Sequence, residues 1–111
     1  MLQMDAEQLL ADLFKALGHP TRVKILKILR QGEICVCDMA PQLELEQSNV
    51  SQHLAVLRNQ GLVTFSKDGL RVVYRLAHPG IMPLLDAAAR LLARQVQAQQ
   101  SVLSQFNRDE K

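Results

Sequence analysis

The chain has 111 residues, of which 48% are hydrophobic and 4% aromatic, and its formal net charge is +2. That length supports one modest core, so we expect a single domain over residues 1–111, and the small charge does not by itself identify a nucleic-acid binder. No stretch approaches the ~20 apolar residues of a membrane span, and Asp5 and Glu7 interrupt the pattern of a signal peptide, so we expect a cytoplasmic protein whose two cysteines stay reduced.

Apolar residues at spacings of three and four predict two short helices near the start of the chain. The first carries the apolar set Ala6, Leu9, Leu10, Leu13, Phe14 and Leu17. Gly18 is expected to end it. The second is expected to begin at Pro20, which suits a first helical position, and to stop at Gly32. We expect these two helices to pack on each other.

The middle of the chain predicts a helix-turn-helix. A short helix and turn are expected over residues 38–45, followed by a longer helix from about Gln47 to Gln60 that Gly61 caps. The longer helix has a narrow apolar seam of Val50, Leu54 and Leu57. Its opposite face carries Ser48, Ser51, Gln52, Ala55, Arg58 and Asn59.

The pattern then changes to that of strands. Residues 62–65 and the β-branched run RVVYRL at 71–76 flank Lys67, Asp68 and Gly69. An Asp-Gly pair between two such runs favours a tight hairpin turn, because that turn needs a positive φ. A two-stranded wing after the helix-turn-helix is therefore predicted.

A final helix is expected to start at Pro79 and to continue, by its apolar spacing, to Phe106. Between Ile81 and Ala93 it is apolar nearly all round, which indicates burial on two sides. We expect a second copy of the chain to supply that cover.

The longer helix of the helix-turn-helix has the composition of a surface that reads the major groove of DNA. The hydroxyls of Ser48 and Ser51 can contact phosphates or bases, and Gln52 can pair with adenine through two hydrogen bonds. His53 lies between the seam and this polar face, where it either touches phosphate or hydrogen-bonds locally.

Three positive charges extend the same surface. Arg58 is expected to contact phosphate, and Lys67 and Arg71 flank the wing tip, where they would meet the DNA backbone. The alternative is an ordinary solvated helix beside a surface hairpin, since serine and glutamine are common on such faces.

Cys35 and Cys37 stand directly before the helix-turn-helix. Residues two apart diverge in a regular helix or strand, so two thiols can grip one ligand only if the backbone there is irregular. At a helix N-terminus both thiols would have a lowered pKa, and a disulfide between them would be strained and is not expected. Soft-metal capture is one interpretation; packing as small hydrophobic residues is the other.

The segments LFKALGHPTRVKILKIL, EICVCDMAPQLELEQSNVSQHLAVLRNQGLV and RVVYRL together resemble the ArsR/SmtB family of bacterial metal-sensing repressors. The resemblance implies a mainly α-helical winged helix-turn-helix protein with four helices, a β-hairpin and a last helix. It also implies a homodimer joined through the first and last helices, which binds double-stranded operator DNA at an imperfect palindrome. On the reading helix and wing it matches Gln47, Ser48, Ser51, Gln52, His53 and Arg71.

The resemblance also implies a ligand for the thiols. Family members with an ELCVCD-like segment respond to arsenic or cadmium, which points to As(III), Sb(III), Cd(II) or Pb(II) at Cys35 and Cys37. The third cysteine of arsenic sensors is Ala40 here, so the third donor is left open among water, a small thiol, His19 and Asp38. A zinc or nickel site on the last helix is not expected, because no histidine follows Asp86.

These observations predict a repressor that needs no cofactor and releases DNA when Cys35 and Cys37 are occupied. A redox or sulfur-species sensor with the same fold is the first alternative. A dimeric interaction module without DNA binding is the second. An enzyme is not expected, because the two cysteines lack a nearby activating base.

Overall fold

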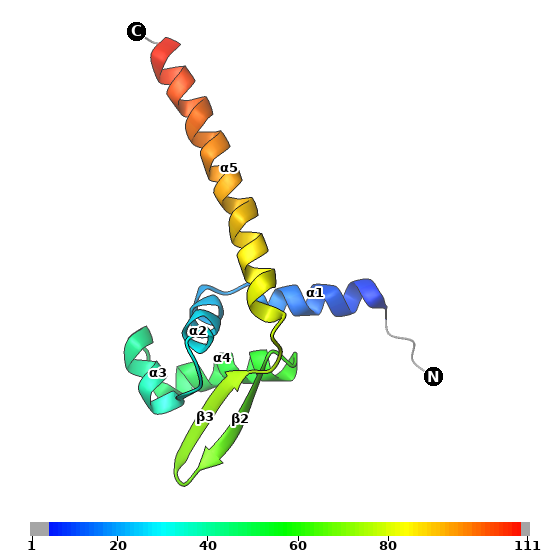
Figure 1. The fold of residues 1–111 in the computed structure, drawn as a ribbon, viewed down its shortest axis with the longest axis vertical. Coiled ribbons are helices and arrows are strands. Elements are labelled where there is room, and N and C mark those ends of the chain that lie inside the picture. Colours follow the sequence, from blue (N-terminus) through cyan, green and yellow to red (C-terminus); the bar gives the residue numbers. More distant parts are fainter. Residues whose placement is uncertain (1–4, 110–111) are drawn as a thin grey trace. The chain divides into compact units, whose positions relative to one another are not determined.

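The computed structural model describes residues 5–109, apart from the side chains at positions 103 and 106–109. The chain divides into two compact units, Met1–Pro79 and Gly80–Lys111. In order, the elements are α1 (Ala6–Leu17), α2 (Pro20–Arg30), β1 (Ile34–Cys35), α3 (Val36–Leu43), α4 (Gln47–Asn59), β2 (Val63–Asp68), β3 (Arg71–Leu76) and α5 (Ile81–Asp109) (Figure 1). The expectation of one domain over 1–111 stays a prediction.

The first two helices are confirmed, and local capping explains where they begin. The Asp5 carboxylate accepts a hydrogen bond from the Glu7 N–H at the start of α1, and Nδ1 of His19 accepts one from the Thr21 N–H at the start of α2. Both contacts satisfy N–H groups that a helix leaves without partners. At the other end of α1, the Arg22 guanidinium donates to the Lys15 and Ala16 carbonyls and so ties α2 to α1.

The core of the first unit lies between α2, α3, α4 and β2. The predicted seam of α4 is confirmed, since Val50, Leu54 and Leu57 have no exposed surface. The other large side chains with almost no exposed surface are Ile25, Leu26, Met39 and Val63. This packing holds α3 and α4 as a helix-turn-helix whose polar faces remain outside.

The sheet differs from the expected hairpin by one strand. β2 and β3 form the predicted antiparallel wing, with Asp68 opposite Arg71 and Gly69 at a φ of 63° in the turn. The short β1 adds to the outer side of β3, so the strand order is β1-β3-β2. Ile34 lies opposite Tyr74, and Cys35 lies opposite Val73. Two residues are too few to show a strand period, which is why the sequence did not indicate β1.

The last helix begins later than expected. The prediction of a start at Pro79 is wrong, because Pro79 and Gly80 form a turn and α5 begins at Ile81. Pro83 falls in the first turn of α5, where a missing N–H costs nothing. Pro79 and Pro83 are four residues apart and both suit the start of a helix, so local preference alone does not decide between them.

Among the helices of residues 5–109, none could span a lipid bilayer.

Candidate thiol site and nucleic-acid interface

The two cysteines lie on either side of a strand-to-helix junction. Cys35 ends β1 in an extended conformation, with φ −69° and ψ 145°, and serves as the N-cap of α3. Its Sγ accepts a hydrogen bond from the Cys37 N–H at 2.9 Å. Cys35 is buried, with 3% of its surface exposed, whereas Cys37 is exposed. This abrupt change of backbone is the irregularity that two neighbouring thiols require to share one ligand.

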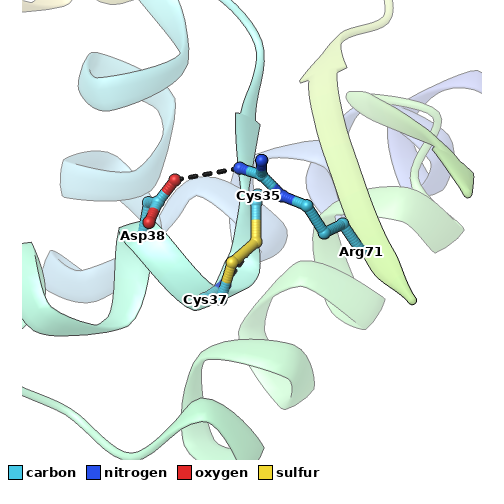
Figure 2. A network of polar contacts seen from close by, with 4 residues as sticks. All are labelled: Cys35, Cys37, Asp38 and Arg71. Atoms are coloured by element: carbon cyan, nitrogen blue, oxygen red, sulfur yellow. Dashed lines mark hydrogen bonds and ion pairs between the residues drawn. A yellow bond between two sulfur atoms is a disulfide. The ribbon is translucent and has the colours of Figure 1, made fainter. Parts of the chain in front are cut away.

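The structure joins Cys35 and Cys37 in a disulfide (Figure 2). The expectation that this bond is absent is therefore wrong, and the expectation that it is strained stays a prediction. A regular helix or strand would separate residues two apart. The extended Cys35 followed by a helical turn instead places the two Cα atoms 5.2 Å apart, inside the usual disulfide range of about 4.4–6.8 Å.

Asp38 completes a group of three potential ligands. The ligand atoms of Cys35, Cys37 and Asp38 all lie within 4.8 Å of one another. His19, the other side chain considered as a third donor, is not in this group and instead contacts His53. Once the Cys35–Cys37 bond is reduced, the site offers two soft sulfur donors and one carboxylate, a set that suits thiophilic divalent ions.

The thiol site is joined to the wing. Arg71, at the start of β3, donates from Nη2 to Oδ2 of Asp38 at 3.1 Å (Figure 2). Further along the same strand, Arg75 pairs with Glu33 at 3.2 Å. Both pairs are more than half exposed, so each contributes roughly 0–1 kcal/mol. Together with the pairing of β1 and β3, they hold the junction against the wing.

The predicted DNA contacts all come from α4 and the wing. Ser48, Ser51 and Gln52 are exposed on α4, and Gln47 is its first residue. Arg58 lies in the last turn of α4, with its guanidinium carbon 5.1 Å from the centre of the Phe65 ring. Lys67 and Arg71 lie in the strands beside the wing tip. Their positions are compatible with DNA contact, and their roles stay predictions.

A cavity of about 460 Å³ connects the thiols with this surface. Its walls come from the end of β1, from α3, from α4 and from the wing. The lining residues are Cys35, Val36, Cys37, Gln47, Ser51, Arg58, Phe65, Leu70, Arg71, Val72 and Tyr74. Both cysteines and four of the predicted DNA contacts therefore share one pocket. Ser48, Gln52, His53 and Lys67 are not part of its lining.

Sequence reasoning missed the aromatic wall of this pocket. Phe65 and Tyr74 are directly opposite each other on β2 and β3, with ring centres 5.4 Å apart. The available signal was the hairpin register, because the tight turn after Asp68 fixes which residues of the two strands face each other. Cross-strand pairing thus places two rings beside the thiols.

His53 has a local partner. Its ring centre lies 4.4 Å from that of His19, the N-cap of α2. Burial lowers the pKa of His53, and the positive charges of His19 and Arg22 lower it further. A neutral imidazole packed between α2 and α4 favours the local role over a phosphate contact.

Comparison with known sequences gives consistent matches. The family described as bacterial regulatory protein, arsR family, matches residues 19–64, which run from the start of α2 into β2. An uncharacterized HTH-type transcriptional regulator of Mycobacterium tuberculosis, Rv0081, is 39% identical over 97 residues, covering 86% of this chain and 85% of the relative. The arsenical resistance operon repressor of Escherichia coli is 42% identical over 92 residues, covering 78% of each chain.

Solved structures agree with these matches. The crystal structure of Rv0081 from M. tuberculosis has a TM-score of 0.80 at 37% identity and covers 87% of this chain and 98% of that one. The solution structure of the homodimeric winged helix-turn-helix DNA-binding domain Mb0332 from Mycobacterium bovis has a TM-score of 0.70 at 28% identity, covering 86% and 92%. The winged helix-turn-helix fold expected from the sequence is thereby confirmed.

Proposed function

We propose, from the premise that this chain belongs to the ArsR family of bacterial transcriptional regulators, that it is a homodimeric repressor which leaves its operator when a thiophilic ligand binds Cys35 and Cys37. Membership of this family makes the chain a regulator and not an enzyme. The observation that carries the proposal is the shared pocket, in which both cysteines face the same cavity as Gln47, Ser51, Arg58 and Arg71.

The DNA-binding part of the proposal follows from the geometry of α4 and the wing. In a helix-turn-helix the second helix enters the major groove and presents short polar side chains to base edges. Gln47, Ser48, Ser51 and Gln52 would fill that role on α4. The positive side chains Arg58, Lys67 and Arg71 would contact phosphates, which supply most of the affinity and make it depend on salt.

Exposed apolar side chains on α1 and α5 support the homodimer. On α1, Leu9, Leu10 and Phe14 are each about half exposed, at 46%, 53% and 52%. On α5, Leu91 and Leu92 are exposed at 62% and 60%. Several large apolar side chains exposed along one helix are typical of a surface that a partner covers. A two-fold dimer would place two reading helices on an imperfect palindrome.

The ligand we propose is As(III), Sb(III) or a soft divalent ion such as Cd(II) or Pb(II). Thiolates select such ions over oxygen-seeking ones, and the similar E. coli protein is an arsenical resistance operon repressor. Asp38 is the third donor in this proposal, because its carboxylate lies with the two sulfurs. This chemistry needs reduced thiols. Thiols stay reduced in the cytoplasm, which is where we propose that the protein acts.

Ligand binding at this site would act on both halves of the DNA-binding surface. Cys35 is paired with β3 and also caps α3, so a ligand that moves it displaces the wing relative to the helix-turn-helix. An allosteric coupling of about 1–3 kcal/mol would weaken DNA binding about 5- to 150-fold.

The test is an operator-binding titration with the reduced protein, run with As(III), Sb(III), Cd(II) and Pb(II) in turn. At least one ligand is expected to release DNA from the parent protein and not from the Cys35→Ser, Cys37→Ser double variant. The double variant should bind DNA normally without ligand. Unchanged ligand-induced release in the double variant would refute the thiol site. Absence of salt-dependent binding to promoter DNA in the parent protein would favour the interaction module without DNA binding.

A redox or sulfur-species sensor is the second candidate, and the Cys35–Cys37 disulfide is the observation that favours it. Here oxidation itself, with no metal, would release DNA. Peroxide or polysulfide treatment, followed by intact mass measurement and operator binding, separates the two candidates. Release that accompanies loss of two hydrogens per chain supports the redox sensor, and unchanged DNA binding by the oxidised protein excludes it.

A further inference from the structure

The pocket at the two cysteines has room for more than a metal ion. Its volume of about 460 Å³ falls in the range of about 300–1,000 Å³ that is typical of sites for small organic molecules. A single ion held by the two sulfurs would use only a small part of this volume. The lining also includes the rings of Phe65 and Tyr74 and the side chains of Arg58 and Arg71.

The two arginines give the pocket a preference for anions. Arg58 stacks on Phe65, and no carboxylate pairs with it in the part of the chain that the structure describes. Arg71 uses one nitrogen for Asp38, which leaves its other N–H groups free to donate. Guanidinium groups bind carboxylates through paired, charge-assisted hydrogen bonds. Carboxylates are therefore the ligand groups that this wall fits.

The two sulfurs of the disulfide are not equivalent. Cys37 is exposed, so an incoming thiolate can reach its Sγ, whereas Cys35 is buried. The Cys37 N–H donates to Cys35 Sγ at the first turn of α3, and this contact stabilises negative charge on that sulfur. Exchange is faster when the departing thiolate is stabilised. Attack at Cys37 with departure of Cys35 is thus the favoured direction.

We infer that this pocket binds low-molecular-weight thiols that carry carboxylates, and that Cys37 is the residue they modify. The ligand thiolate attacks Cys37 Sγ and forms a new S–S bond with it. The Cys35–Cys37 bond breaks, and its electron pair leaves on Cys35 as a thiolate. The ligand sulfur is oxidised and Cys35 is reduced, so the exchange needs no further oxidant. The ligand carboxylates pair with Arg58 and Arg71.

The adduct has a direct consequence for the proposed repressor. A molecule attached to Cys37 in this pocket lies against Gln47, Ser51, Arg58 and Arg71, four of the predicted DNA contacts. This inference rests on the thiols of the proposed function, but the exchange itself requires neither DNA nor a metal.

The experiment compares three thiols on the full-length oxidised protein: mercaptosuccinate with two carboxylates, neutral 2-mercaptoethanol and cationic cysteamine. Each is supplied at the same thiolate concentration and low salt, and the reaction is stopped with N-ethylmaleimide, which alkylates the released Cys35. Intact mass and peptide mapping then give the rate and the site. Mercaptosuccinate should react roughly tenfold faster than 2-mercaptoethanol, as expected for two exposed ion pairs, with the adduct on Cys37.

Matched arginine variants identify the source of this preference. Arg58→Gln and Arg71→Gln should each reduce it severalfold. Arg75→Gln should retain it, because Arg75 lies on the same strand as Arg71 but pairs with Glu33 and does not line the pocket. High salt should abolish the preference in the parent protein, which provides a test even if a variant fails to fold.

Four results would overturn the inference: absence of the Cys35–Cys37 bond from the oxidised protein, an adduct on Cys35, equal rates for the three thiols, or the same loss of preference in Arg75→Gln as in Arg71→Gln. Failure of metal-induced DNA release would leave these rates unchanged, so the failure of the proposed function and the failure of this inference are distinguishable.

Discussion

The pattern of burial differs between helix α4 and the strand-to-helix junction at Cys35. Along α4, burial repeats every three or four residues, so Val50, Leu54 and Leu57 are covered while the polar face stays outside. At the junction, the backbone changes from strand to helix at a single residue, and exposure changes from buried Cys35 to exposed Cys37. In the proposed function, the regular helix provides a rigid surface for reading DNA, and the abrupt junction is the place where a ligand acts on two elements.

A substitution in the buried apolar seam of α4 should have the largest effect on stability. Leu54→Ala removes a fully buried side chain and is expected to lower the free energy of unfolding by about 2–5 kcal/mol, from lost burial and the cavity left behind. Urea denaturation followed by circular dichroism measures this. Gln52→Ala, on the exposed face of the same helix, is the control and should change stability by less than about 0.5 kcal/mol. Equal losses in the two variants would contradict the assignment of the faces.

The carboxylate at the junction should matter for metal affinity. Asp38→Asn is expected to weaken Cd(II) binding by the reduced protein roughly tenfold, because a charged donor beside the thiols is lost. Titration of the thiolate-to-metal absorbance gives the affinity. Glu33→Gln is the matched control, since Glu33 also pairs with an arginine of β3 but is not in the ligand group. If both variants bind Cd(II) like the parent, Asp38 is not a ligand.

The two cysteines should differ in their effect on stability under reducing conditions. Cys35→Ala removes the side chain that caps α3 and should cost about 0.5–2 kcal/mol of unfolding free energy. Cys37→Ala removes an exposed side chain and should stay within about 0.5 kcal/mol. Thermal unfolding in the presence of a reductant compares them. A larger loss for Cys37→Ala would show that the junction is packed differently in the reduced protein.

The smallest expected effect is the pH dependence that His53 contributes. Its pKa in the folded chain is lowered by burial and by the charges of His19 and Arg22, so the unfolded chain binds protons more readily. The contribution of His53 to stability is therefore full above the ordinary pKa of 6.5 and decreases as the pH falls from there towards the folded-state pKa. Urea midpoints at pH 7.5 and 5.5, compared for the parent and His53→Gln, measure it. A parent protein that loses no more stability than His53→Gln between these pH values would contradict the prediction.

Much of the first unit was predictable because its signals are local. The caps at Asp5 and His19 and the seam of α4 act within one or two helical turns. The hairpin follows from the Asp-Gly pair and the β-branched runs around it. The positions of the predicted DNA contacts on α4 and the wing follow from these elements together.

The candidate ligand site differs from the expectation because of contacts between residues that are distant in sequence. β1 exists because Ile34 and Cys35 pair with Tyr74 and Val73 about forty residues later, a contact that no local pattern indicates. The same pairing makes the backbone at Cys35 extended, which brings Cys37 to its side. The contact of Asp38 with Arg71 likewise joins α3 to β3.

The sequence by itself determined the helix-turn-helix, the wing hairpin and the presence of two cysteines ahead of them, because spacing, caps and turn residues act over a few residues. Only the tertiary structure decided that the cysteines meet, that Asp38 and not His19 lies with them, and that the two cysteines open into a pocket with Arg58 and Arg71. The physical reason is that these positions depend on strand pairing and on packing between distant segments. No short stretch of the chain contains both partners of such interactions.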